Sequence, residues 1–158
     1  MLHIALYEPE IPANTGNIIR LCANTGAQLH LIEPLGFDLD DKKLRRAGLD
    51  YHEWVHVKRY PNFAAFMSTL QPQQRLFALT TKGKTPYNNA GFQDQDVLLF
   101  GPETRGLPLE LLQSIASERK LYLPMCAESR SLNLSNTVAV ALYAAWQDIQ
   151  FQGALLKA

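Results

Sequence analysis

Short apolar segments that alternate with helix-forming segments are the feature that most constrains how this chain can fold. Residues 97–100, Val-Leu-Leu-Phe, carry no polar side chain, which is typical of a strand covered on both faces in a parallel sheet. Further strands are predicted at residues 2–7, 28–33, 54–58, 76–80 and 121–123. Helices are predicted between and after them, at residues 15–25, 40–47, 63–70, 108–116 and 135–150. We therefore predict an α/β fold, a mostly parallel six-stranded sheet with helices on both faces, formed by one domain that spans residues 1–158.

Composition narrows the class of protein. The 15 basic and 15 acidic side chains give zero net charge, whereas general nucleic-acid-binding proteins are usually basic, so any nucleic-acid partner must be recognised by local features. The chain starts without the basic, apolar pattern of a signal peptide, and no apolar run approaches the roughly 18 residues of a membrane helix. Cys22 and Cys126 form no CxxC pair. We expect a cytoplasmic protein with reduced thiols and no membrane partner.

The loop after residue 100 interrupts the apolar pattern with Gly-Pro-Glu-Thr-Arg-Gly. Ligands of parallel sheets bind beyond the carboxyl ends of the strands, which directs attention to the loops after residues 80, 100 and 123. Gly101 permits a close approach of a ligand to the backbone, and Pro102 and Pro108 stiffen the two ends of the segment. The alternative is an ordinary surface turn with a Glu103–Arg105 ion pair.

Arg20 is the candidate anion-binding residue of the first predicted helix. It lies about 200° around the helix from Ile18, on a face shared with Gly16, Asn17 and Asn24 and without an acidic neighbour. An unpaired guanidinium near the start of a helix suits a phosphate. The alternative, which the sequence supports equally well, is an exposed arginine that binds no ligand.

The loop after residue 123 is rich in hydroxyl and amide side chains: Ser129, Ser131, Asn133, Ser135 and Asn136, with Arg130 among them. Capping of the following helix would use one or two of these residues and leave the others without a role. The helix itself has no polar face between Val138 and Trp146. Such a helix is buried on every side, which favours contact with a second subunit as well as with its own core.

Three other patterns are weaker indications of function. Residues 52–56, His-Glu-Trp-Val-His, match the HExxH zinc motif, but Trp54 and Val55 favour a strand, which would hold the two histidines too far apart. Residues 78–85 end like a phosphate-binding P-loop yet lack its first glycine and its helix. Residues 40–46, Asp-Asp-Lys-Lys-Leu-Arg-Arg, are better explained as a solvated helix whose charges complement its dipole than as a nucleic-acid patch.

Three longer segments together resemble the motifs of the SPOUT RNA methyltransferases. They are Asn-Thr-Gly-Asn-Ile-Ile-Arg-Leu-Cys-Ala-Asn-Thr-Gly at residues 14–26, Leu-Leu-Phe-Gly-Pro-Glu-Thr-Arg-Gly-Leu-Pro at 98–108, and Arg-Ser-Leu-Asn-Leu-Ser-Asn-Thr-Val-Ala-Val-Ala-Leu-Tyr-Ala-Ala-Trp at 130–146. The likeness extends over the whole chain. It is strongest to the short bacterial members that methylate the ribose 2′-hydroxyl of the wobble nucleotide, a cytidine or modified uridine, in leucine tRNAs.

The resemblance implies more than the residues alone predict. It implies a deep trefoil knot in the C-terminal part, a homodimer, a tRNA substrate and S-adenosyl-L-methionine as methyl donor, with no metal. By similarity, backbone groups of Leu79, Gly101 and Leu123, together with Ser131, would hold the cofactor. The catalytic residues would be Arg20 and Asn133. The alternative is a non-catalytic RNA-binding or assembly factor that keeps the fold, but binding alone would not require both of these residues.

Overall fold

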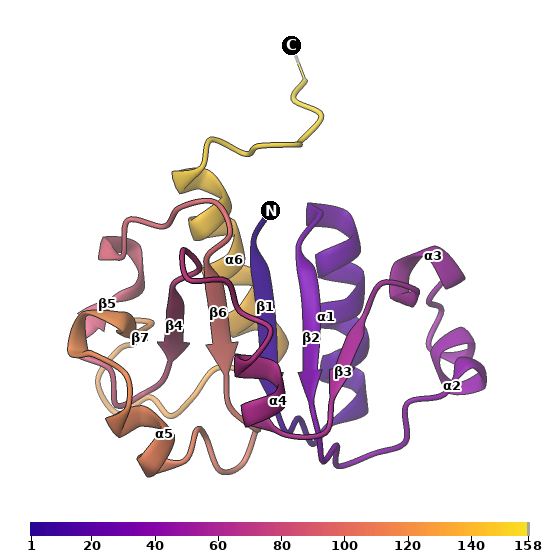
Figure 1. Ribbon diagram of the computed structural model, residues 1–158, viewed down its shortest axis with the longest axis horizontal. Helices are drawn as coiled ribbons and strands as arrows, with labels where there is room; N and C mark the ends of the chain where they lie inside the picture. The colour runs from indigo at the N-terminus through magenta and orange to yellow at the C-terminus, as the bar shows by residue number, and fades with distance from the viewer. Residues whose placement is uncertain (158) are drawn as a thin grey trace.

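The computed structural model describes residues 1–157, which contain one seven-stranded sheet in the order β3-β2-β1-β6-β4-β7-β5. All the strand pairs are parallel. The strands are β1 (His3–Tyr7), β2 (Gln28–Ile32), β3 (Lys58–Tyr60), β4 (Leu76–Leu79), β5 (Thr85–Pro86), β6 (Val97–Phe100) and β7 (Lys120–Tyr122). Their carboxyl ends point to the same edge of the sheet (Figure 1). The predicted α/β class and parallel sheet are confirmed, and the predicted count of six strands is wrong.

Helices cover both faces of the sheet (Figure 1). They are α1 (Pro12–Thr25), α2 (Asp41–Arg46), α3 (Tyr51–Trp54), α4 (Phe63–Met67), α5 (Leu109–Gln113) and α6 (Leu134–Asp148), with 3-10 turns η1 (Tyr87–Asn89) and η2 (Ser117–Arg119). Side chains alternate along each strand, so Ile4 and Leu6 of β1 join the core beneath α1 and α6, whereas Ala5 joins the core beneath α4 and α5. The helices α2 and α3 lie outside the sheet, beside α1.

The structure corrects the sequence prediction around residues 54–58. Tyr51–Trp54 forms the short helix α3, and β3 begins only at Lys58. The cause is a capping box, in which the Glu53 carboxylate accepts a hydrogen bond from the backbone N–H of Asp50 at 3.0 Å. This local helix start outweighs the strand preference of Trp54 and Val55. The missed strand β5 has two residues and contains a proline, which leaves no alternation to detect.

The start of helix α1 is capped by a carboxylate from a distant part of the chain. Its N-cap residue Ile11 offers no capping side chain. Glu103, from the loop after β6, accepts hydrogen bonds from the backbone N–H groups of Glu10 at 2.8 Å and Ile11 at 2.7 Å, and from the Asn14 amide at 3.1 Å. A negative charge at this end also complements the helix dipole. The loop after β6 therefore fixes where α1 begins.

The same loop makes a second set of contacts with the residues that precede α1. Thr104 donates from its backbone N–H and its hydroxyl to Glu10, and the backbone bond is the larger cause that lowers the pKa of Glu10. Arg105 reaches Glu8 at 3.4 Å and Glu10 at 3.9 Å. The alternative of a Glu103–Arg105 pair is wrong, because each of these side chains contacts the segment before α1 instead.

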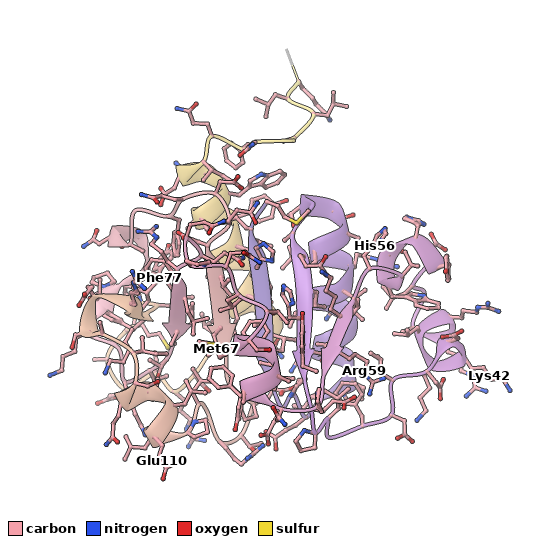
Figure 2. All side chains as sticks on the ribbon, viewed as in Figure 1. Lys42, His56, Arg59, Met67, Phe77 and Glu110 are labelled. Carbon is pink, nitrogen blue, oxygen red and sulfur yellow. The ribbon has the colours of Figure 1, made fainter. Side chains whose placement is uncertain are left out.

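We predict that Glu103→Ala lowers the free energy of unfolding by about 1.5–3 kcal/mol, because it leaves the amides before α1 without their charged acceptor. The matched control is Glu110→Ala, since Glu110 is exposed on α5 and points away from the sheet (Figure 2). The control should change stability by less than ~0.5 kcal/mol. Urea unfolding of the two variants measures both values, and equal losses would contradict the capping role of Glu103.

Candidate functional site

The loops after β4, β6 and β7 converge on one cavity of about 500 Å³ at the carboxyl edge of the sheet. The start of α1 contributes Ile11 and Asn14 to the same cavity. Five of the six residues singled out in the sequence line it: Leu79, Gly101, Leu123, Ser131 and Asn133. The structure therefore brings together segments that are far apart in sequence, where the parallel-sheet rule predicts a ligand site.

Gly101 is required by the path of the chain itself. A Cβ atom at this position would lie 2.5 Å from the backbone nitrogen of Leu107 and 2.6 Å from the carbonyl carbon of Gly106. Such contacts are far inside van der Waals distance, so the turn after β6 folds back against its own strand end. The returning backbone is thus one reason for glycine at this position, and the approach of a ligand to Gly101 stays a prediction.

Asn133 caps helix α6. Its Oδ1 accepts hydrogen bonds from the backbone N–H of Ser135 at 2.9 Å and from the Ser135 hydroxyl at 2.6 Å. The capping interpretation is thus confirmed for Asn133, and the cap also places this side chain on the cavity wall. Its Nδ2 group makes no hydrogen bond within residues 1–157, so one amide donor is still available at the wall.

Arg20 lies apart from this cavity, in a second hollow of about 280 Å³ between α1 and the α2 segment. The expected absence of an acidic partner is wrong. Arg20 Nε donates to Glu53 at 2.9 Å, and Nη2 donates to the Gly48 carbonyl. The helix face of Arg20 does lack an acid, but α3 supplies one from 33 residues further along the chain.

Glu53 is itself held in place by two contacts. One carboxylate oxygen accepts from the Asp50 backbone in the capping box, and the other accepts from Arg20. The hydrogen bond from Arg20 is the largest cause that lowers the pKa of Glu53, and the bond to Glu53 is the largest cause that raises the pKa of Arg20. Both groups are therefore charged throughout the physiological range, and Arg20 is held along one edge of its guanidinium.

The contacts of Glu53 explain the HExxH segment at residues 52–56 without a metal site. Ligand-type atoms of Asp50, His52 and Glu53 lie within 4.8 Å of one another. The Glu53 carboxylate is already engaged by Arg20 and by the cap of α3. His56 is not part of the group. Sequence reasoning missed the role of Glu53, although Asp50 followed three residues later by a glutamate is a recognisable capping-box signal.

Comparison with known proteins now identifies the family. Residues 1–143 match the SpoU rRNA Methylase family. The chain belongs to this family. A relative named tRNA (cytidine(34)-2'-O)-methyltransferase from Escherichia coli is 58% identical over 157 residues, which cover 99% of each chain. A relative of the same name from Aeromonas hydrophila is also 58% identical, over 98% of this chain and 99% of its own.

Solved structures of RNA methyltransferases agree with the fold. One, described as giving structural insights into the 2-OH methylation of C/U34 on tRNA, has a TM-score of 0.87 at 47% identity and covers 95% of this chain and 97% of its own. An AdoMet-bound rRNA methyltransferase from Sinorhizobium meliloti has a TM-score of 0.79 at 25% identity, over 92% of this chain and 56% of its own. Within residues 1–157, no helix is long and apolar enough to cross a membrane.

Proposed function

We propose that this protein transfers the methyl group of S-adenosyl-L-methionine to the ribose 2′-hydroxyl of nucleotide 34, a cytidine or modified uridine, in leucine tRNAs, and acts as a cytoplasmic homodimer. The observation that carries the proposal is the convergence of Leu79, Gly101, Leu123, Ser131 and Asn133 on one cavity. It is supported by 58% identity over nearly the full length to relatives named for methylation at cytidine 34.

The cavity suits the proposed cofactor chemically. Leu79, Phe100 and Leu123 form apolar walls for a flat base, while Ser131 offers a polar contact for the cofactor's ribose or amino-acid tail. Its volume of about 500 Å³ lies in the usual range for small-molecule sites. S-adenosyl-L-methionine would supply an electrophilic methyl group on sulfur and leave as S-adenosyl-L-homocysteine, and the chemistry needs no metal.

A trefoil knot in the C-terminal part is a further element of the proposal. Strand β7 lies between β4 and β5, although both of these precede it in the chain. A Cβ atom at Gly83 would lie 2.7 Å from the carbonyl group of Leu121, so residues 80–86 pass tightly against β7. A loop that passes this closely across a later strand is one feature of a knotted chain, and it supports this part of the proposal.

In this proposal, the protein accelerates the reaction by positioning the ribose 2′-hydroxyl. The protein would hold the 2′-hydroxyl beside the methyl group that the cofactor supplies, and the hydroxyl proton would pass to solvent. Arg20 is not the base, because a guanidinium stays protonated in proteins. Its role is to bind the adjacent phosphate and to stabilise negative charge that develops on the 2′-oxygen. The free amide of Asn133 orients the ribose.

The separation of Arg20 from the cavity favours a dimeric site. Within one chain, Asn14 and Arg20 lie on different faces of α1 and line different hollows. Arg20 would therefore act on the RNA bound at the cofactor cavity of a second copy. Helix α6 has side chains suited to such an interface, because Val138 and Leu142 are buried in its own core while Val140 and Tyr143 remain 42% and 47% exposed.

Mapping of tRNA methyl groups by mass spectrometry, in cells with and without this gene, tests the function directly. We expect loss of the 2′-O-methyl group from nucleotide 34 of leucine tRNAs when the gene is deleted. A loss confined to another nucleotide would contradict the proposed substrate. Unchanged tRNA methylation, with retained RNA binding, would favour the alternative of a non-catalytic RNA-binding or assembly factor.

Arg20→Ala should lower turnover at least ~100-fold, or about 2.7 kcal/mol, because it removes a contact to the transition state. Cofactor affinity, measured by calorimetry, should change little. Arg20→Lys should be almost as poor, since lysine lacks the planar fork for a phosphate. Arg59→Ala is the matched control, because Arg59 also forms an exposed ion pair, with Glu33, but lines neither hollow. Near-normal turnover by Arg20→Ala would remove the proposed role.

Glu53→Gln tests whether Glu53 acts through Arg20. The substitution keeps the shape of the side chain but removes the charge that holds the guanidinium, so we expect a lower kcat with unchanged cofactor affinity. A double-mutant cycle separates the mechanisms, because residues that act through one another are not additive. The double variant Arg20→Ala, Glu53→Gln should be no slower than Arg20→Ala alone. Fully additive losses would give Glu53 a separate role.

A further inference from the structure

A hollow of about 280 Å³ separates the first half of α1 from residues 37–49. Its floor is apolar, because Leu44 and Leu49 are 6% and 4% exposed. Phe37 is half-buried in the wall, and Arg20 and Lys43 stand at the rim. This hollow is separate from the cavity at the carboxyl edge of the sheet, although α1 contributes residues to both.

We propose that this hollow binds one nucleotide of the RNA substrate, with its base against Phe37 and its phosphate between Arg20 and Lys43. The proposal rests on the proposed tRNA methylation and extends it, since it assigns a binding site for the substrate. It also gives a role to the basic segment at residues 40–46, whose interpretation as a solvated helix left Lys43 without one.

The rim carries the charge that a phosphate requires. Glu53 and Gly48 hold one edge of the Arg20 guanidinium, and Nη1 makes no hydrogen bond within residues 1–157. Lys43 contacts Asp38 at 3.6 Å, but these side chains are 52% and 89% exposed, so the pair is weak and Lys43 is able to exchange it for a phosphate. Asp40 does not compete, because its carboxylate caps α2 by accepting from the Lys43 backbone.

The remaining walls favour a base over other occupants. An aromatic ring beside two aliphatic side chains offers a stacking surface that accepts any base. The volume is near the lower limit for small-molecule sites, which suits one nucleotide and is too small for a longer segment. An acidic peptide would use the two cations but leave the apolar floor and Phe37 without a partner.

The test measures tRNA binding separately from methyl transfer, with bulk bacterial tRNA as the probe and filter binding at several salt concentrations. Lys43→Ala should reduce the slope of log affinity against log salt by about one phosphate contact. Lys42→Ala is the matched control, because Lys42 is the preceding residue of the same short helix, carries the same charge and does not line the hollow (Figure 2). Its slope should stay closer to that of the wild type than the slope of Lys43→Ala.

Phe37→Leu tests the base contact, because it keeps an apolar side chain and removes the aromatic face. We expect at least ~5-fold weaker tRNA binding, whereas Phe37→Tyr should bind as the wild type does. Equal slopes for Lys42→Ala and Lys43→Ala, or wild-type binding by Phe37→Leu, would overturn the proposal. Binding that follows these expectations in a protein that transfers no methyl group would uphold the nucleotide site and refute the proposed methylation.

Discussion

The carboxylate of Glu103 is the contact on which the arrangement of this protein depends. It joins the loop after β6, near the middle of the sheet, to the residues that begin α1. Hydrogen bonds to a charged acceptor are stronger than those between neutral groups, and Thr104 adds a reciprocal pair to Glu10. Helix α1 is thereby positioned by the same loop that forms one wall of the cavity at the carboxyl edge of the sheet.

Helix α1 in turn divides the proposed site residues between two hollows. Its first turn closes the cavity lined by Leu79, Gly101 and Leu123, and its Arg20 faces the hollow beside α2. The orientation of Arg20 comes from Glu53, whose position is set by the capping box of α3. The short helix α3 contributes little to the core, and its structural role is to hold one edge of the Arg20 guanidinium while Nη1 makes no hydrogen bond within residues 1–157.

The sequence predicts most of the fold for a physical reason. Strands β1, β2, β4, β6 and β7 lie in a buried sheet, and burial on both faces produces apolar runs that can be recognised without knowledge of their neighbours. Strand β3 was misplaced because Asp50 and Glu53 start a helix where Trp54 and Val55 favour a strand. The cavity loops follow from the rule for parallel sheets. The partner of Arg20 cannot be predicted by such a rule, because a contact between residues 20 and 53 depends on how two helices pack.

Glu103 is a second residue whose contacts could not be predicted from the sequence. Its sequence neighbour Arg105 suggests a local ion pair, yet its actual partners are residues 10, 11 and 14, more than 85 positions earlier in the chain. Likewise, Gly101 is expected from the sequence to permit the approach of a ligand, but only the structure shows that the backbone of Leu107 also lies against it. Residue type thus predicts that a contact is needed, whereas the packing of distant segments determines which atoms make it.

Subunit mixing tests most directly whether Arg20 of one copy serves the cofactor cavity of another. Arg20→Ala removes the arginine, and Ser131→Trp fills the cavity, so each variant alone should be inactive. In a symmetric dimer with randomly exchanged subunits, half of the dimers are mixed and one of their two sites is intact, so activity should return to about a quarter of the wild-type value. If the mixture, with exchange confirmed by native mass spectrometry, stays inactive, each chain uses its own Arg20 and the two-chain site is wrong.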